Sequence, residues 1–255
     1  MAQKSGPVTH LCFTDTDRIL VRGKDLCSDL VGKMSFTEMM LFHLMGTPPT
    51  SQQVAVVDAV LITIMEHGLT PSAIAARQTY FGAPEALQGA LAAGILGVGS
   101  RFAGTSGDCA ILLSEIVDAP QDRKKEVARS IAERFRAAGK FVPGYGHPVH
   151  KNGDPRVARL IEIATEQDVE GAYIEAMYML GGAVDAAKGR KLVINASAAM
   201  GAVMAEVDIP PDIMRGLVIV SRAAGLVGHL LEEMQQPASQ RIWDLVEHGV
   251  PYEEV

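Results

Sequence analysis

Apolar residues recur at helical spacing along most of this 255-residue chain, and this periodicity restricts the fold more than any other feature of the sequence. Ala, Leu and Met abound, whereas aromatic residues make up only 5%. Strands favour β-branched and aromatic residues in alternation with polar ones. Residues 13–21 are the one stretch typical of a strand or hairpin. The sequence therefore predicts a mostly α-helical protein.

Capping residues and helix breakers divide the chain into successive helices. Ser35 and Glu38 have the form of a capping box. Thr70 stands before Pro71 as an N-cap stands before the first helical residue. Two prolines begin the last long helix, and a short tail follows it. We expect helices over about 35–44, 51–65, 70–80, 83–92, 109–117, 121–138, 156–167, 169–188 and 211–234, and an apolar segment over 192–207.

Two glycine-rich segments, at about 94–108 and 139–155, interrupt the helices, and such loops often carry function. In the second segment, fixed donors near glycine-rich backbone can bind a carboxylate or a phosphate. A plain Asp-Pro turn between two helices explains the same pattern equally well. The donors in question are His147, His150, Lys151 and Arg156.

The last long helix carries Arg222, Gly225 and His229 on one face, because these residues lie three, four and seven positions apart. An arginine among apolar neighbours is costly unless it is paired, and Gly225 leaves room for a close approach. One interpretation is a structural salt bridge from Arg222 to Glu232, Glu233 or another acid. The other is an anion-binding site.

Charge and cysteine content exclude several classes of protein. The formal net charge of -7 argues against a nucleic-acid partner. No uninterrupted apolar run reaches the ~18 residues of a membrane span, and the first ten residues lack the apolar stretch of a secretory signal. Cys12, Cys27 and Cys109 form no CxxC pair, which fits a reducing compartment. We expect a cytoplasmic protein that binds neither membranes nor nucleic acid.

Metal-ligand spacing is missing from the sequence, because His147 and His150 form one pair without a third ligand nearby. No metal site is expected. His67 lies in a polar break between helices, where an imidazole can donate a hydrogen bond into a cleft. A lone histidine more often packs or caps, so this residue alone does not decide between a site and a structural role.

Taken in order, these segments resemble the citrate synthase family over nearly the whole chain. EHGLTPSAIAAR is similar to its first catalytic-histidine segment, GYGHPVHKNGDPR to its GxGHxVYKxxDPR loop, and SRAAGLVGHLLEE to its SRxxGxxAHxxEQ helix. GVGSRFAG resembles the version found in citryl-CoA lyase and in the carboxyl-terminal module of ATP-citrate lyase. The short interval from Pro49 to His67 also resembles these lyases more than a full citrate synthase.

The resemblance implies an all-α, citrate synthase-like homodimer with its active site in a cleft between two helical lobes. The large lobe would comprise residues 1–66 and 200–255, and the small lobe residues 67–199. The implied ligand is coenzyme A, as an acyl-CoA substrate or product. The implied reaction is carbon–carbon bond cleavage of a citryl-CoA-like acyl-CoA to an acyl-CoA and a keto acid. Alternatives are a diverged condensing or retro-Claisen enzyme for another acyl-CoA, and a non-catalytic acyl-CoA-binding protein.

By motif position, the resemblance also implies roles for single residues. His67 would donate a hydrogen bond to the thioester oxygen of an enolate, while His147 and Arg222 would hold carboxylates of the acyl group. Other implied substrate-binding residues are Arg156, Arg159, Ser197 and Arg241, the last of them in the partner subunit's site. The residues implied to face coenzyme A are Gly97, Gly99, Arg101, Gly104 and Lys151.

Two positions depart from the family pattern. The family's second histidine aligns with Ala103, as in the lyase-like version. The family's base, a carboxylate in an NVD segment, falls at Ser197, and a hydroxyl cannot serve as a carboxylate base. Either Asp108 or Glu66 replaces it, or the proton moves through substrate or water.

Overall fold

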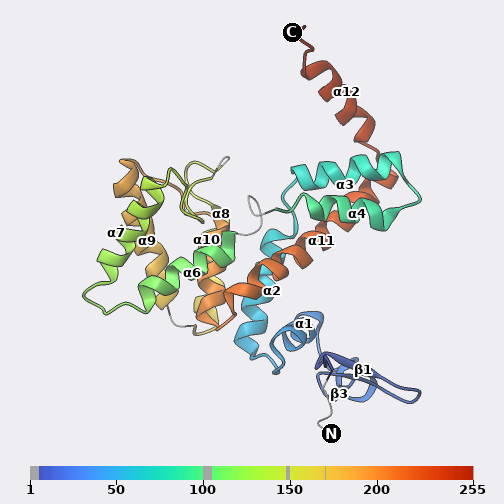
Figure 1. Cartoon of the computed structure of the whole chain (residues 1–255), viewed down its shortest axis with the longest axis horizontal. Coiled ribbons are helices and arrows are strands. Elements are labelled where there is room, and N and C mark those ends of the chain that lie inside the picture. Colours follow the sequence, from blue (N-terminus) through green and yellow to red (C-terminus); the bar gives the residue numbers. More distant parts are fainter. Residues whose placement is uncertain (1–5, 100–104, 148–149, 170, 255) are drawn as a thin grey trace.

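The computed structural model describes residues 6–99, 105–147, 150–169 and 171–254, and helices dominate this part of the chain. The predicted all-α class is confirmed, with one small antiparallel sheet near the N-terminus (Figure 1). Its strands are β1 (Cys12–Thr14), β2 (Ile19–Val21) and β3 (Lys24–Asp25), and a helical turn, η1 (Leu26–Leu30), follows. The hairpin expected over 13–21 is therefore present as β1 and β2.

Eleven further helices are described. They are α1 (Phe36–Met45), α2 (Ser51–Met65), α3 (Pro71–Gly82), α4 (Leu87–Leu96), α6 (Thr105–Val117), α7 (Lys124–Ala137), α8 (Pro155–Glu166), α9 (Ala172–Lys188), α10 (Ala196–Glu206), α11 (Pro211–Gln235) and α12 (Ser239–Gly249).

Two helix starts test the capping predictions. The capping box at α1 is confirmed: the Glu38 N–H donates to Ser35 Oγ (3.2 Å), and the Ser35 N–H donates to Glu38 Oε2 (2.6 Å). At α3 the prediction is half right. Pro71 is the first helical residue, but the Thr70 hydroxyl bonds to the Ser72 hydroxyl (3.0 Å) and does not cap the α3 backbone.

The main hydrophobic core joins α2, α6, α7, α8, α9 and α10 with the first turns of α11. A second cluster packs α3 and α4 on the later turns of α11 through Ala73, Ala90 and Leu226. In Figure 1, α6 to α10 lie together on one side, α3 and α4 lie on the other, and α11 runs across to both. The lobe boundaries stay a prediction, and α3 and α4, assigned to the small lobe, pack on α11 of the large one.

α11 is long and apolar enough to cross a membrane by length and composition alone. Half of its most apolar 18-residue stretch is buried in this fold, and its buried side chains include Arg222, His229 and Glu233. Core helices of proteins without membrane spans pass the same test, and here α11 joins both hydrophobic clusters.

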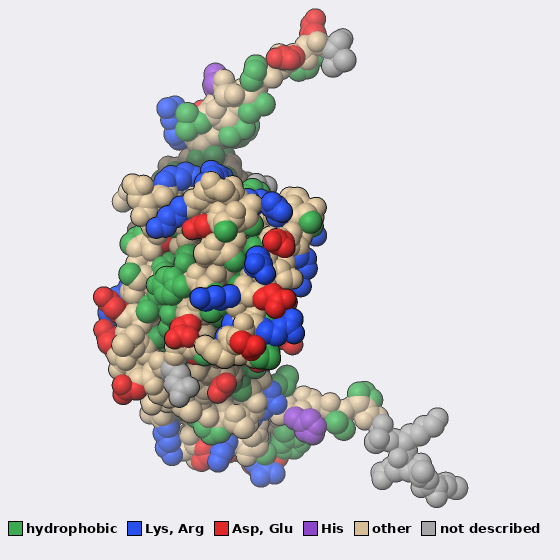
Figure 2. Space-filling view, turned by 90° about the vertical axis from the view of Figure 1, so that its left-hand side faces the viewer, with side chains coloured by type: hydrophobic (Ala, Val, Ile, Leu, Met, Phe, Trp, Pro, Cys, Tyr) green, Lys and Arg blue, Asp and Glu red, His purple; other side chains and the backbone are tan. Residues whose placement is uncertain are grey.

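The tail expected after residue 234 is a further helix, α12, and that expectation was wrong. Ile242, Leu245 and Val246 have helical spacing, but the prolines and the glycine around them suggested an irregular end. α12 extends away from the body (Figure 1). Hydrophobic side chains are uncovered along it (Figure 2). Its contact with the body includes an edge-on packing of Trp243 against Phe81 of α3.

Candidate active site

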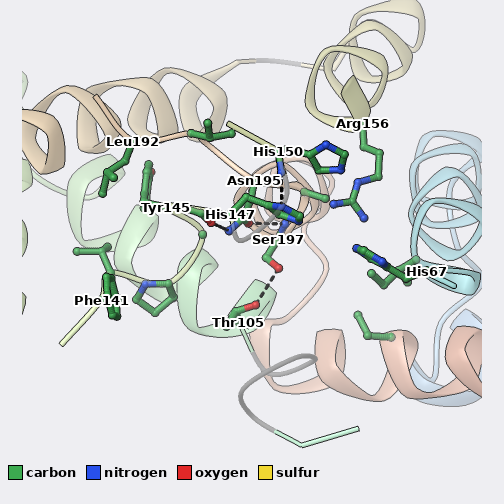
Figure 3. A pocket seen from close by; sticks show the side chains of 18 of the residues that line it. His67, Thr105, Phe141, Tyr145, His147, His150, Arg156, Leu192, Asn195 and Ser197 are labelled. Carbon is green, nitrogen blue, oxygen red and sulfur yellow. Dashed lines mark hydrogen bonds between the residues drawn. The ribbon is translucent and has the colours of Figure 1, made fainter. Parts of the chain in front are cut away.

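A cavity of about 870 Å³ lies between the loop after α7, the start of α10, the turn before α3, and α11 (Figure 3). It brings together seven of the residues that the sequence predicted for a site, one of which is the candidate donor His150. The other six are His67, His147, Lys151, Arg156, Ser197 and Arg222.

Close backbone packing fixes the loop that carries His147. Gly144 adopts φ +88°, and a Cβ there would lie 2.7 Å from the Ala198 Cβ on α10, so only glycine fits. The Gly146 N–H donates to the Val193 carbonyl (2.7 Å), and Asn195 Nδ2 donates to the Gly146 carbonyl (2.7 Å). The loop is thereby held against the first turn of α10.

Three imidazoles line this cavity. The His147 ring lies 6.2 Å from the His67 ring, nearly parallel to it, and 4.4 Å from the His150 ring. The backbone N–H of His150 donates to His147 Nδ1 (2.9 Å), so a neutral His147 carries its proton on Nε2. Burial lowers the pKa of His147, and the neighbouring His150 lowers it further. At neutral pH, His147 is therefore an uncharged hydrogen-bond donor.

Arg156 is held in place by Asp154, the N-cap of α8. Arg156 donates to both carboxylate oxygens (2.9 and 2.7 Å), and the Ala196 N–H donates to Oδ2 (2.9 Å). Burial opposes ionisation of Asp154, but the bonds from Arg156 and Ala196 prevail and lower its pKa to about 2. Asp154 is thus a fixed anion that orients Arg156 and ties α8 to the start of α10.

The expectation that His147 and His150 have no third potential ligand nearby was wrong, because the turn before α8 folds back and brings Asp154 close. Donor atoms of the three residues lie within 4.8 Å of one another. Both Asp154 oxygens already accept hydrogen bonds, however, and the guanidinium of Arg156 beside them repels a cation. The arrangement suits an anion better than a metal ion.

Arg222 is buried on α11 and closes the end of α2. Its Nη1 donates to the Met65 carbonyl (2.9 Å), one of the carbonyls that a helix end leaves without a partner. The predicted close approach at Gly225 is confirmed, because a Cβ there would lie 2.0 Å from the Met65 oxygen. The alternative of a salt bridge from Arg222 to Glu232 or Glu233 is wrong, since both acids pair with Arg77.

A chain of polar contacts fixes the turn that carries His67. The Glu66 carboxylate accepts the N–H groups of His67 (2.7 Å) and Gly68 (2.6 Å), and it contacts His229 Nε2 (3.0 Å). Arg77 Nε donates to His229 Nδ1 (3.1 Å). Burial raises the pKa of Glu66, but the bonds from His67, His229 and Gly68 outweigh this and lower it. Glu66 is thus engaged in positioning and does not line the cavity.

Several other residues that the sequence predicted for the site lie away from the cavity. Arg159 is exposed and donates to Glu162 and Glu166 (2.9 Å each), because its position on α8 faces outward, so it is not a second clamp here. Asp108 is exposed on α6 and, like Glu66, does not replace the missing base in the cavity. Arg241 is exposed on α12, outside this cavity.

Of the five residues predicted to face coenzyme A, Lys151 is the one found among the described lining residues of the cavity. Gly97 ends α4, and neither it nor Gly99 lines the cavity, although Val98 between them does. Arg101 and Gly104 lie outside the described residues, as does Ala103.

Several residues that line the cavity were not predicted from the sequence. Arg190 and Lys191 follow the left-handed Gly189 that ends α9, and both reach the cavity. The GRK sequence after a helix was the available signal, but it is too common on surfaces to be specific. Among the described residues that line the cavity, no aspartate or glutamate occurs. Other missed lining residues are Thr105, Phe141, Tyr145, Leu192 and Asn195.

Ser197 sits in the first turn of α10 and faces the cavity (Figure 3). The Thr105 hydroxyl donates to Ser197 Oγ (2.8 Å), so the Ser197 proton is left to point elsewhere. The pair can donate a hydrogen bond to a ligand oxygen, but it carries no charge at neutral pH.

Several known proteins are similar to this chain in sequence or structure. Residues 14–243 match the family model described as Citrate synthase, C-terminal domain. The structure of citryl-CoA lyase from Hydrogenobacter thermophilus is similar with a TM-score of 0.84 and 31% identity, covering 97% of this chain and 94% of that one. An ATP citrate lyase from Methanothrix soehngenii, in complex with citrate and coenzyme A, shares the fold with a TM-score of 0.77 at 19% identity, over 100% of this chain and 43% of that one.

Sequence relatives include a citrate synthase of Haloferax volcanii, 26% identical over 198 residues, which are 76% of this chain and 50% of the relative. A citrate synthase of Synechocystis is 26% identical over 208 residues, or 79% of this chain and 50% of the relative. The chain thus spans about half the length of the curated citrate synthases that it matches.

Proposed function

Since this chain belongs to the citrate synthase family, we propose that it cleaves a carbon–carbon bond in a citryl-CoA-like acyl-CoA to give an acyl-CoA and a keto acid. One observation carries the proposal: a single cavity gathers arginines, lysines and histidines, with no acid among its described lining residues. A ligand with carboxylates at one end and phosphates at the other complements such a lining.

Two kinds of cation in the cavity suit the two kinds of anionic group in this substrate. Arg156 and Arg222 bind carboxylates, because a guanidinium presents paired donors in a plane that matches a carboxylate. Lys151, Arg190 and Lys191 are exposed at the cavity and bind the phosphates of coenzyme A.

Cleavage needs a base for the hydroxyl proton and donors for the charge that develops. As the hydroxyl loses its proton and becomes a ketone, the bond to the α-carbon breaks and its electron pair forms the thioester enolate. N–H donors aimed at that oxygen stabilise it, often by several kcal/mol. His67 supplies this hydrogen bond, while His147 Nε2 and Arg222 hold carboxylates of the leaving keto acid.

A second candidate is a diverged condensing or retro-Claisen enzyme for another acyl-CoA. The hydroxyl pair of Ser197 and Thr105 favours it, because two neutral donors stand where the family pattern has a carboxylate. A non-catalytic acyl-CoA-binding protein is the third candidate. It predicts binding of coenzyme A without any product.

A substrate panel separates these candidates. Citryl-CoA and several other 3-hydroxyacyl- and 3-ketoacyl-CoAs are incubated with the wild type and with His67→Ala, and products are followed by mass spectrometry. We expect citryl-CoA to be cleaved, with a rate about 10²- to 10³-fold lower in His67→Ala, as for loss of one oxyanion donor. Cleavage of another acyl-CoA of the panel, but not of citryl-CoA, supports the second candidate. Binding of acyl-CoA without any product supports the third.

The proposed assembly is a homodimer in which a second copy covers α12. Trp243, Leu245 and Val246 are 54%, 57% and 58% exposed, which is unusual for large apolar side chains gathered on one short helix. Arg241 on α12 then reaches the partner's cavity. We expect sedimentation at micromolar concentration to give twice the mass of the chain, and Leu245→Asp to give a single chain. A wild-type monomer would contradict the assembly.

A further inference from the structure

We propose that His150 is the catalytic base that takes the hydroxyl proton of the substrate and returns it to the α-carbon. This inference rests on the proposed function and adds the proton carrier that the cleavage needs. It starts from the composition of the cavity, where no aspartate or glutamate is found among the described lining residues. We assign the proton transfer to a titratable side chain of another type, in place of substrate or water.

Two other titratable groups of the cavity are already committed. The Tyr145 hydroxyl donates to the Met177 carbonyl (2.8 Å), and burial raises the pKa of Tyr145, so its phenolate is inaccessible at neutral pH. Lys151 Nζ donates to the His147 carbonyl (2.9 Å) and is therefore already engaged as a donor. The arginines are charged at any working pH. Among the described lining residues, the histidines are the proton acceptors that remain.

The three histidines differ in what their nitrogens can do. His147 accepts a hydrogen bond at Nδ1 from the His150 backbone, which leaves Nε2–H as a donor. His67 lies next to the turn held by Glu66 and, in the proposed function, donates to the thioester oxygen. His150 lines the cavity, and neither of its ring nitrogens has a hydrogen bond to any described residue. Its lone pair is therefore available to a substrate hydroxyl.

The position of His150 matches the atom that must lose a proton. In Figure 3 its ring lies on the same side of the cavity as Arg156, and it packs against His147 with ring centres 4.4 Å apart. Carboxylates bound by Arg156 and His147 flank the carbinol carbon in a citryl group. In this proposal the hydroxyl on that carbon faces the His150 ring.

The proton transfer balances without another reactant. A His150 nitrogen takes the hydroxyl proton, the carbon–oxygen bond becomes a carbonyl, and the bond between the carbinol carbon and the α-carbon breaks toward the thioester. The imidazolium then gives the same proton to the α-carbon of the enolate, which forms the acyl-CoA. The carboxylate of Asp154, near both rings, favours the imidazolium between the two steps, while Arg156, Lys151 and His147 oppose it when they are charged.

The test compares kcat, KM and the pH dependence of citryl-CoA cleavage in the wild type and His150→Asn, with His10→Asn on the exposed N-terminal segment as the matched control. We expect His150→Asn to lower kcat by about 10²- to 10⁴-fold with little change in KM or coenzyme A affinity. The pH profile of kcat should also change, which the loss of a merely structural residue would not cause. The control should keep the wild-type rate and profile.

A second variant tests whether proton transfer is the lost step. Adding Ser197→Asp to His150→Asn supplies a carboxylate in the cavity, and kcat should rise above that of His150→Asn alone. A His150→Asn rate within twofold of the wild type overturns the inference and leaves the cleavage function intact. A His150→Asn variant whose kcat is reduced but whose pH profile is that of the wild type also overturns the inference. A wild type that cleaves no acyl-CoA overturns the proposed function together with the inference.

Discussion

Arg222→Ala should lower kcat/KM for citryl-CoA by about 10²- to 10³-fold, which corresponds to about 3–4 kcal/mol of lost binding in the transition state. The guanidinium is buried, so its charge is poorly screened and its pairing with a carboxylate is strong. Burial also lowers the pKa of Arg222, but an arginine stays charged at working pH. Arg222→Lys should recover only part of the loss, because an ammonium cannot donate in a plane.

The matched control for this prediction is Arg159→Ala. Arg159 is a guanidinium of the same chain, but it is exposed and bound to Glu162 and Glu166. Its removal should change kcat/KM by less than about twofold, in line with the small effects of exposed ion pairs. Because Arg222 also bonds to the Met65 carbonyl, thermal unfolding of each variant must accompany the kinetics. Equal losses in Arg222→Ala and Arg159→Ala would refute the assignment of Arg222 to the substrate.

Arg77→Leu should destabilise the protein by about 3–5 kcal/mol. Arg77 is only 2% exposed, and it pairs with the equally buried side chain of Glu233 (2.9 Å) and with Glu232. Truncation leaves the charge of Glu233 buried without its partner, and it also removes the donor that orients His229. Urea unfolding followed by circular dichroism measures the change as a lower midpoint at an unchanged slope.

Arg134→Leu serves as the comparison for Arg77→Leu. Arg134 donates to Glu115 (2.9 Å), but both side chains are largely exposed. Water and salt screen such a pair, so its loss should change the free energy of unfolding by less than about 1 kcal/mol. If Arg77→Leu and Arg134→Leu unfolded at the same urea concentration, the buried ion pairs of Arg77 would not contribute about 3–5 kcal/mol to stability.

The local signals in the sequence predicted much of this fold. The capping box at Ser35 and the prolines that begin α3 and α11 mark helix starts that depend on neighbouring residues alone. α12 was missed because it has few apolar residues and they pack on little of this chain. The stretch that shows helical periodicity is therefore short, and the residues around it resemble a loop.

The candidate site was predicted only in part, because tertiary contacts complete it. Sequence spacing placed Arg222 and Gly225 on one face, yet only the fold reveals that the end of α2 fills the space at Gly225. Similarly, Arg156 and Arg159 were equivalent in sequence, and the fold of α8 separates them by turning Arg159 outward. The cations at 190–191 join the cavity because α9 ends beside the loop after α7.

The most direct test of the central claim is the identity of the products formed from citryl-CoA. Purified protein is incubated with citryl-CoA, and acetyl-CoA, oxaloacetate, citrate and free coenzyme A are quantified by mass spectrometry. A carbon–carbon lyase predicts acetyl-CoA and oxaloacetate in equal amounts, at a rate proportional to enzyme. Citryl-CoA that is bound and released intact, or hydrolysed to citrate and free coenzyme A, would contradict the cleavage function.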